Sequence, residues 1–285
     1  MRKILVTGAS GFIGKNLCEF YKADNEVLEV GKSTLLMNCL NSFKPDIVFH
    51  CAAEIYKEPL MVHSNILYSQ CVLDYCANSK IEKLVIFGSS SEYGYKTRPM
   101  SEEDLLEPRT IYEATKGAAT LLAQAYSKIY SIPTVVIRPF TIVGRHEKTH
   151  KFFPTLYKKW KMDEELTLGE GFHDFVFIDD FVRMVNDITF KNLKTFDIVN
   201  VGSGFSTSNS EIVEIFESLT GYEYKIKKVD KLRSFDSNFW VANTEKAKRV
   251  YGTDVFNGRN LTNREYLECG IRKFIEDCEN LKLYV

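Results

Sequence analysis

The chain has 285 residues and a net charge of -1, with 45% hydrophobic and 26% charged residues. This length fits one large α/β unit with an added lobe, and the composition is that of a globular protein. The balanced charge gives no general attraction to nucleic acid or to an acidic membrane surface. Seven cysteines form no CxxC pair, which indicates reduced thiols rather than a disulfide framework.

The first strand pattern begins at the third residue, which leaves no room for a cleavable signal. No apolar run approaches the length of a membrane span. His146 and His150 have no companions at metal-ligand spacing. We therefore expect a soluble cytoplasmic protein that binds no nucleic acid, no membrane and no metal.

Short apolar runs alternate with longer amphipathic segments along the chain. Continuous Val/Ile/Leu runs predict strands at 3–7, 26–30, 46–52, 83–89, 134–139, 175–179 and 196–202. Helical patterns lie at about 12–23, 34–43, 63–79, 111–131 and 209–221. This alternation predicts an α/β fold with a doubly wound parallel sheet that is covered on both faces.

The alternation loosens after about Glu147, so we expect a smaller, interleaved C-terminal lobe. Residues 1–150 with about 173–203 would form a Rossmann-type dinucleotide-binding domain. About 151–172 and 204–285 would form the substrate-binding lobe.

The stretch TGASGFIG places Gly8, Gly11 and Gly14 directly after the first strand and at the start of the first helix. These glycines permit a tight turn, close backbone approach to a phosphate, and helix–strand packing. The helix N-terminus would face the pyrophosphate of a dinucleotide. The spacing is GxxGxxG rather than GxGxxG, and its strand–turn–helix context supports dinucleotide binding.

A second stretch, TIYEATKG, places Tyr112 and Lys116 four residues apart. On a helix the two side chains lie on one face, where an ammonium stabilises the charged form of a phenol. An exposed pair without chemistry has the same spacing, so the pair needs support from other motifs.

That support comes from the order and spacing of several motifs: TGASGFIG, PDIVFHCAA (45–53), GSSSEYG (88–94), YEATK (112–116), IRPF (137–140) and HDFVFIDD (173–180). Together they resemble the extended short-chain dehydrogenase/reductase family of nucleotide-sugar epimerases, dehydratases and keto-reductases. The resemblance runs from Val6 to about Gly252. It implies a homodimer and a nucleotide-sugar substrate.

The resemblance also implies the site residues. Tyr112 would be the general acid/base, Lys116 would lower its pKa and hold the nicotinamide ribose, and Ser89 would polarise the substrate oxygen. Ser90 and Ser91 are alternatives to Ser89 and would lie on the substrate side. The remaining cofactor contacts would come from Gly8, Ser10, Gly11, Phe12, Ile13, Gly14, Lys32, Ala52 and Ala53.

On the substrate side the resemblance implies Lys151, His173 and Arg233, the last on the sugar-nucleotide diphosphate. Two of these positions depart from the family: His173 stands where arginine is usual, and Lys151 where asparagine is common. These departures put the identity of the sugar and of the nucleotide in doubt.

The resemblance leaves three activities to compare. Dehydratases carry an acid and a base directly after the active hydroxyl, where this chain has Ser90 and Ser91, so dehydration is disfavoured. Gly31 and Lys32 replace the carboxylate that binds the NAD ribose, which favours NADP(H), with NAD(H) as the other option. Lys32 could equally be a solvated loop lysine.

We accordingly expect NADPH-dependent reduction of the 4-keto group of a nucleotide-activated 6-deoxysugar. The alternative is an NAD-dependent nucleotide-sugar epimerase with the same residues. A non-catalytic dinucleotide sensor is a third hypothesis, although such proteins typically lose the tyrosine or the lysine.

Overall fold

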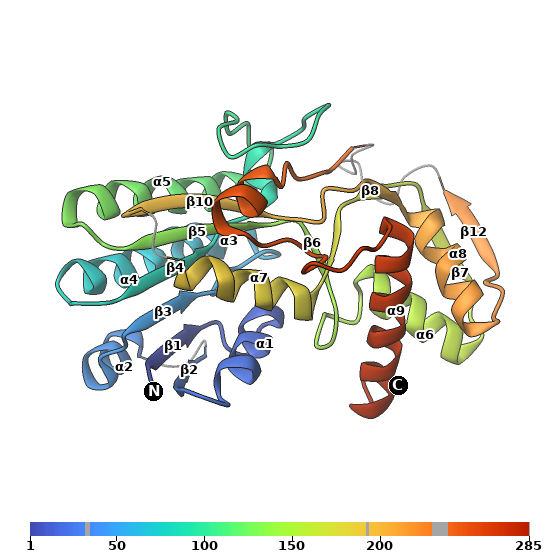
Figure 1. Cartoon of the computed structure of the whole chain (residues 1–285), viewed down its shortest axis with the longest axis horizontal. Coiled ribbons are helices and arrows are strands. Elements are labelled where there is room, and N and C mark those ends of the chain that lie inside the picture. Colours follow the sequence, from blue (N-terminus) through green and yellow to red (C-terminus); the bar gives the residue numbers. More distant parts are fainter. Residues whose placement is uncertain (32–34, 192–193, 230–238, 285) are drawn as a thin grey trace.

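The structure is a computed structural model that describes residues 1–31, 35–191, 194–229 and 239–284. Its central feature is a six-stranded sheet with the order β10-β5-β4-β3-β1-β2, in which every neighbouring pair is parallel (Figure 1). The strands are β1 (Lys3–Thr7), β2 (Glu26–Val30), β3 (Ile47–His50), β4 (Lys83–Phe87), β5 (Thr134–Pro139) and β10 (Phe196–Val201). The parallel sheet predicted from the sequence is confirmed.

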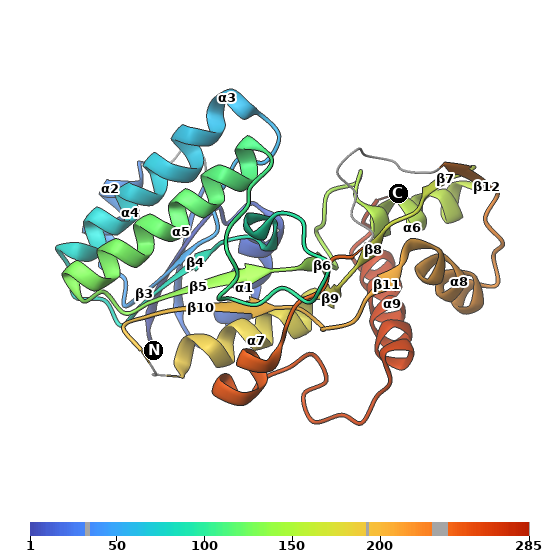
Figure 2. The same cartoon turned by 90° about the horizontal axis from the view of Figure 1, so that it is seen from above.

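Helices cover both faces of this sheet, as Figure 2 shows from above. One face carries α2 (Leu36–Phe43), α4 (Tyr68–Ala77) and α5 (Ile111–Tyr130), and the other carries α1 (Phe12–Tyr21) and α7 (Ile178–Phe190). Strand alternation explains the two layers, since Leu5 packs towards α2, α4 and α5 while Ile4 and Val6 pack on the opposite side. The fold is therefore doubly wound.

Strand order reverses between β1 and β3, because β2 lies on one side of β1 and β3 on the other. In open α/β sheets ligands bind outside the carboxyl ends of the strands at such a switch point. Gly8 follows β1 and Ala52 follows β3, so the glycine turn lies at this position. In the order β2-β1-β3-β4-β5-β10, β2 is the edge strand of the described sheet. The described sheet therefore has no further strand beyond β2, unlike sheets with the 3-2-1-4-5-6 order, where strand 3 lies outside strand 2.

The remaining elements gather mainly beside this sheet. They comprise α3 (Glu58–Met61), η1 (Val62–Leu67), η2 (Ser90–Tyr93), β6 (Thr141–Val143), α6 (Phe152–Met162), β7 (Leu166–Gly169), β8 (Phe172–His173), β9 (Phe175–Phe177), β11 (Thr207–Ser208), α8 (Asn209–Thr220), β12 (Ile226–Val229), η3 (Ala247–Tyr251) and α9 (Asn263–Asn280). Figure 1 shows α6, α8, α9, β7 and β12 forming a lobe at the C-terminal side of the molecule.

One predicted element differs from the observed structure. The run at 175–179 was expected to be one strand, but β9 ends at Phe177 and α7 begins at Ile178. Its strand pairs with β6 outside the central sheet. The reason is that the first turn of α7 buries Ile178 and Phe181 in the core, so an apolar run here serves a helix.

One hydrophobic core joins the sheet to the lobe. It includes Phe49 of β3, Phe153 of α6, Phe216 of α8 and Phe274 of α9. Phe153 lies with its ring centre 5.7 Å from that of Phe216 and 5.6 Å from that of Phe274. Within the described part of the chain, no helix is both long and apolar enough to cross a membrane.

Candidate active site

The glycine turn has the geometry that an approaching pyrophosphate needs. Gly8 has φ +67°, and a Cβ there would lie 2.8 Å from the backbone nitrogen of Ala52. A Cβ at Gly14 would lie 2.3 Å from the carbonyl oxygen of Gly8, so side chains at these positions would separate α1 from the turn. Among the described residues, no side chain caps the N-terminus of α1 and its first turn holds no acid. The amides and the helix dipole therefore fit a dinucleotide phosphate.

A capping box starts the helix that carries the predicted acid/base. Thr110 accepts the amide hydrogen of Glu113 at 3.2 Å, and the Glu113 carboxylate accepts the amide hydrogen of Thr110 at 3.1 Å. This reciprocal pair fixes the first turn of α5 and with it the position of Tyr112. Gly117, one residue beyond Lys116, keeps this part of α5 close to Leu106.

Ser89 and Tyr112 come together across the ends of β4 and α5. The Ser89 hydroxyl is close enough to the Tyr112 phenol to lower its pKa, and Ser89 also caps η2 by accepting the amide hydrogen of Ser91 at 3.2 Å. The Ser89 and Ser91 hydroxyl oxygens are 2.7 Å apart. A hydroxyl and a phenol are thus placed where both could reach one substrate oxygen.

The net effect of the surrounding protein is to raise the pKa of Tyr112, whereas the Tyr–Lys spacing had led us to expect a lower pKa. Burial raises the pKa of Tyr112 to about 12, although Ser89 opposes this rise. Lys116 is buried, and burial lowers the pKa of its amine. Its Nζ donates a hydrogen bond to the carbonyl oxygen of Phe87, at the end of β4. The Tyr112 phenol is therefore protonated at neutral pH in the protein itself.

His50 is buried, and both of its ring nitrogens contact hydroxyl groups of the protein. Its Nδ1 is 2.8 Å from Thr7 Oγ1 and its Nε2 is 2.9 Å from Ser69 Oγ. Burial, helped by the nearby Lys116 charge, lowers the pKa of His50 to about 3. The ring is a neutral bridge between β1 and α4, in keeping with a packing role.

Two residues near the site were not predicted from the sequence. The Tyr56 hydroxyl is 2.9 Å from His150 Nε2, and Tyr56 is close enough to Tyr112 to raise the pKa of that phenol. Glu147 in turn affects Tyr56, and burial raises the pKa of the Glu147 carboxyl to about 8. Its Oε2 is buried and has no hydrogen-bond partner among the described residues. The only sequence signal was an acid within a basic run at 145–151.

The other predicted substrate residues lie on different elements of the fold. Ser90 is buried and accepts a hydrogen bond from Trp240 Nε1 at 3.0 Å. Lys151 is the N-cap of α6, and His173 lies in β8, which pairs with β11. Lys32 and Arg233 lie outside the described residues.

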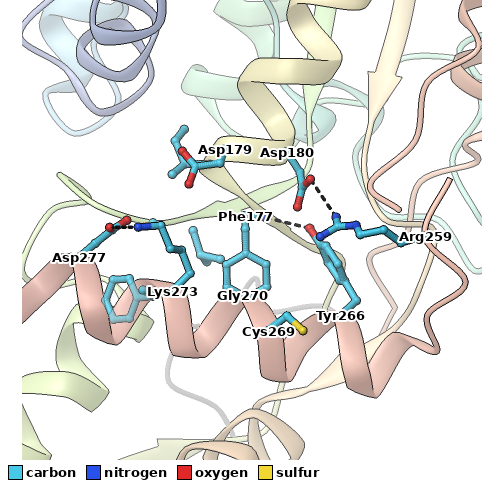
Figure 3. Close-up of a pocket in the computed structure, with 13 residues that line it drawn as sticks. Phe177, Asp179, Asp180, Arg259, Tyr266, Cys269, Gly270, Lys273 and Asp277 are labelled. Carbon is cyan, nitrogen blue, oxygen red and sulfur yellow. Dashed lines mark hydrogen bonds and ion pairs between the residues drawn. The ribbon is translucent and has the colours of Figure 1, made fainter. Parts of the chain in front are cut away.

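A cavity of about 220 Å³ lies elsewhere, between the start of α7 and α9 (Figure 3). Its charges are paired: Lys273 Nζ is 2.5 Å from Asp277, and Arg259 is 3.1 Å from Asp180. None of the predicted site residues lines it. In the described ranges, no group of three or more His, Cys, Asp or Glu residues could hold a metal ion.

Parallel α/β enzymes with a glycine turn at the switch point form the class of dinucleotide-binding Rossmann proteins, and the fold places this chain among them. The chain belongs to the NAD dependent epimerase/dehydratase family, whose family model matches residues 4–202.

Two relatives named as epimerases match most of the chain. An uncharacterized UDP-glucose epimerase, YtcB of Bacillus subtilis (strain 168), is 29% identical over 294 residues, covering 88% of this chain and 92% of that protein. UDP-glucuronate 4-epimerase 3 of Arabidopsis thaliana is 27% identical over 93% of this chain and 76% of its own.

Two solved structures resemble the whole fold. MoeE5 in complex with UDP-glucose and NAD has a TM-score of 0.86 at 26% identity, covering 98% of this chain and 99% of that one. UDP-glucuronic acid 4-epimerase from Bacillus cereus, in complex with UDP-glucuronic acid and NAD, has a TM-score of 0.83 at 25% identity, with the same coverage.

Proposed function

We propose that this protein is an NAD-dependent nucleotide-sugar 4-epimerase. The arrangement that carries the proposal is the Ser89 hydroxyl close to the Tyr112 phenol, with Lys116 buried one helical turn further along α5, at the carboxyl end of a parallel sheet with a glycine turn at its switch point. The activities that the names of the relatives state and the NAD in the similar structures support it.

Each residue then has a defined role. The phenol of Tyr112 exchanges a proton with the sugar 4-hydroxyl oxygen, and the Ser89 hydroxyl donates to the same oxygen when it becomes a carbonyl. Lys116 lies on the same face of α5 as Tyr112, where its positive charge would offset the effect of burial on the phenol. NAD, when bound, supplies reversible oxidation at the sugar carbon. The amides of the glycine turn and of α1 hold its pyrophosphate.

The structure gives a reason to set dehydration aside. That reaction needs a strong acid and base next to the active hydroxyl, and Ser90 and Ser91 hold those positions. The Ser90 hydroxyl is bonded to Trp240 and that of Ser91 to Ser89, while the Glu92 carboxylate points into a buried ion pair.

The 4-keto-6-deoxysugar reductase expected from the sequence uses the same Ser89, Tyr112 and Lys116. The geometry of these three residues is common to both activities, and the names of the relatives favour the epimerase. The preference for NADP(H) depended on Lys32 and stays a prediction, as does the contact of Arg233 with the diphosphate.

We further propose a homodimer and a division of the binding work. The sheet domain would hold the dinucleotide and the C-terminal lobe the nucleotide sugar. A patch of exposed apolar side chains lies on α3, η1 and α5, which contact one another. It comprises Leu60, Val62, Leu67, Ile111 and Leu121. A patch of this kind fits a second copy of the chain.

The test supplies the purified protein with UDP-glucose, UDP-glucuronate and further nucleotide 4-hydroxy sugars, with and without NAD, and identifies the sugar product. The epimerase predicts the 4-epimer without net change in nicotinamide absorbance. A parallel arm offers nucleotide 4-keto-6-deoxysugars with NADPH or NADH. Stoichiometric cofactor oxidation there, with no epimer in the first arm, would contradict the epimerase in favour of the reductase.

A further inference from the structure

One face of α5 contacts the end of β4 and the turn after it at three successive helical turns. Tyr112, Lys116 and Thr120 are spaced by four residues, so their side chains lie on the same face. The Tyr112 phenol lies close to Ser89, Lys116 Nζ donates to the Phe87 carbonyl oxygen, and Thr120 Oγ1 donates to Glu92 Oε2 at 3.0 Å. The partner of the third turn, Glu92, has no assigned role in the reaction.

Both oxygens of the Glu92 carboxylate are used inside the protein. Its exposed fraction is 0%. Oε1 accepts the amide hydrogen of Ser89 at 2.8 Å. Oε2 accepts from Thr120 and from two nitrogens of Arg138, Nε at 3.0 Å and Nη2 at 2.9 Å. Glu92 therefore connects the backbone of the predicted catalytic serine to α5 and to β5.

Arg138 provides the counter-charge of this buried carboxylate. Its side chain is 2% exposed, and its guanidinium lies 4.5 Å from the ring centre of Tyr93. A buried charge without a partner is strongly unfavourable, whereas a well-bonded pair is tolerated. The Tyr93 hydroxyl donates to Asn200 at 2.7 Å, so the pair is fixed on a second side.

The Glu92 charge also acts on Lys116. Three described groups interact with the charge of this amine: His50 of β3, Cys51 directly after β3, and Glu92 of η2. His50 is neutral, and burial raises the pKa of the Cys51 thiol, so it is neutral too. Burial lowers the pKa of Lys116, and the Glu92 carboxylate is the main group that opposes this effect.

We propose that Glu92, with Arg138 as its counter-ion, is a positioning residue of this site that holds the Ser89 turn against α5 and places a negative charge one helical turn from Lys116. Its effect on turnover rests on the proposed epimerase function, while its effect on Lys116 does not. The carboxylate of this pair would thus act on the reaction without touching the substrate.

The variants separate charge from shape. Glu92→Gln keeps the side-chain shape but leaves Arg138 buried without a counter-ion, so it is expected to be unstable. The double variant Glu92→Gln/Arg138→Met removes both charges and keeps similar volumes, a change that folded proteins tolerate. Thr120→Val is the matched control, because it removes one hydrogen bond from Glu92 and leaves both charges in place.

The first readout is the pKa of Lys116. It is measured by NMR from the pH dependence of the lysine ¹³Cε signal in labelled protein, and the signal is assigned by its loss in Lys116→Met. The pKa of Lys116 is expected to fall by about one unit in the double variant and to stay unchanged in Thr120→Val. The second readout is the pH profile of epimerisation. In the double variant the alkaline limb of this profile should move to lower pH by a similar amount. The double substitution should also lower kcat by a larger factor than it changes KM.

The outcomes separate the two proposals. A folded double variant with an unchanged Lys116 pKa overturns the role of Glu92. An unchanged alkaline limb alongside a lowered Lys116 pKa overturns its part in catalysis. Absence of epimerase activity in the unmodified protein would overturn the proposed function instead, and the NMR titration would still decide whether Glu92 holds the charge of Lys116.

Discussion

Trp240 donates its indole N–H to the hydroxyl of Ser90 at 3.0 Å, across 150 positions of sequence. The backbone next to it is bonded to the same region, since Met100 N donates to the Val241 carbonyl at 2.9 Å and Asn243 N to that of Met100 at 2.8 Å. Trp240 packs with Tyr93, Met100 and Phe140. A segment from the C-terminal part of the chain therefore lies directly beside the turn that carries Ser89.

This contact predicts an optical signal for substrate binding. The chain has two tryptophans, and only Trp240 bonds to a residue next to Ser89, while Trp160 lies in α6. Adding UDP-glucose or UDP-glucuronate should change the tryptophan emission of the wild type and of Trp160→Phe. The change should be lost in Trp240→Phe. If the emission change is lost in Trp160→Phe and kept in Trp240→Phe, then Trp160 in the lobe reports binding and this prediction is wrong.

Substitution of the phenol should stop turnover without affecting the dinucleotide. Tyr112→Phe removes the proton donor, so kcat should fall by about 10²–10⁴-fold. The dissociation constant for NAD, measured by calorimetry, should change by less than about threefold, since the glycine turn is intact. Tyr126→Phe is the control on the same helix, because its hydroxyl bonds to Asp74 at 2.7 Å on the surface. Full activity of Tyr112→Phe would refute the assigned acid/base.

The glycine turn should not accept a methyl group at its third glycine. In Gly14→Ala the new Cβ would lie 2.3 Å from the Gly8 carbonyl oxygen. We expect a loss of about 1–3 kcal/mol in the free energy of unfolding, with weaker NAD binding. Gly117→Ala in α5 would meet Leu106 at an ordinary 3.4 Å and should be neutral or more stable by up to about 1 kcal/mol. Urea denaturation compares the two variants.

Glu147 should make stability depend on pH near neutrality. Burial raises the pKa of its carboxyl from 4.5 to about 8. The unfolded chain therefore loses this proton first, and the free energy of unfolding should fall as the pH rises from about 5 to 8. In Glu147→Gln the free energy of unfolding should fall over this pH range by about 2–4 kcal/mol less than in the wild type. Glu165→Gln, at an exposed position, should leave the slope unchanged. Denaturation curves at several pH values measure it.

The proposed homodimer predicts a change in mass. Leu121 on α5 is 58% exposed, and Leu67 on η1 is 47% exposed. If a second copy covers them, Leu121→Glu buries a charge in the interface and should give a monomer in light scattering. Ile129→Glu, near the far end of α5, is the comparison. A wild type that is monomeric at micromolar concentration would rule out this interface.

The elements predicted well are those whose own residues decide the structure. β1, β4 and β5 are continuous apolar runs, and α5 has a capping box and a regular apolar face. α9 was missed because charged residues alternate closely with its buried Tyr266, Ile271 and Phe274. The strand order was not predictable from local pattern, since it depends on which long-range pairings form.

The candidate site divides in the same way. Ser89, Tyr112 and Lys116 were predicted as site residues from the resemblance of their motifs, and the fold places the Ser89 hydroxyl close enough to Tyr112 to affect its pKa. The role of Glu92 was not apparent, because its partners Thr120 and Arg138 lie 28 and 46 positions away. Likewise, the raised pKa of Tyr112 results from burial by distant segments, which a local Tyr–Lys spacing does not reveal.

The aromatic core shared by the sheet and the lobe restricts how a substrate can enter. Phe49, Phe153, Phe216 and Phe274 belong to one buried cluster. Swinging the lobe away as a rigid body would expose these rings to water, at a cost of about 2 kcal/mol for each buried side chain. Entry and release should therefore depend on local movement of the segments that border Tyr56 and Glu147. The turnover rate would then be sensitive to solvent viscosity but little affected by cross-linking the lobe to the sheet.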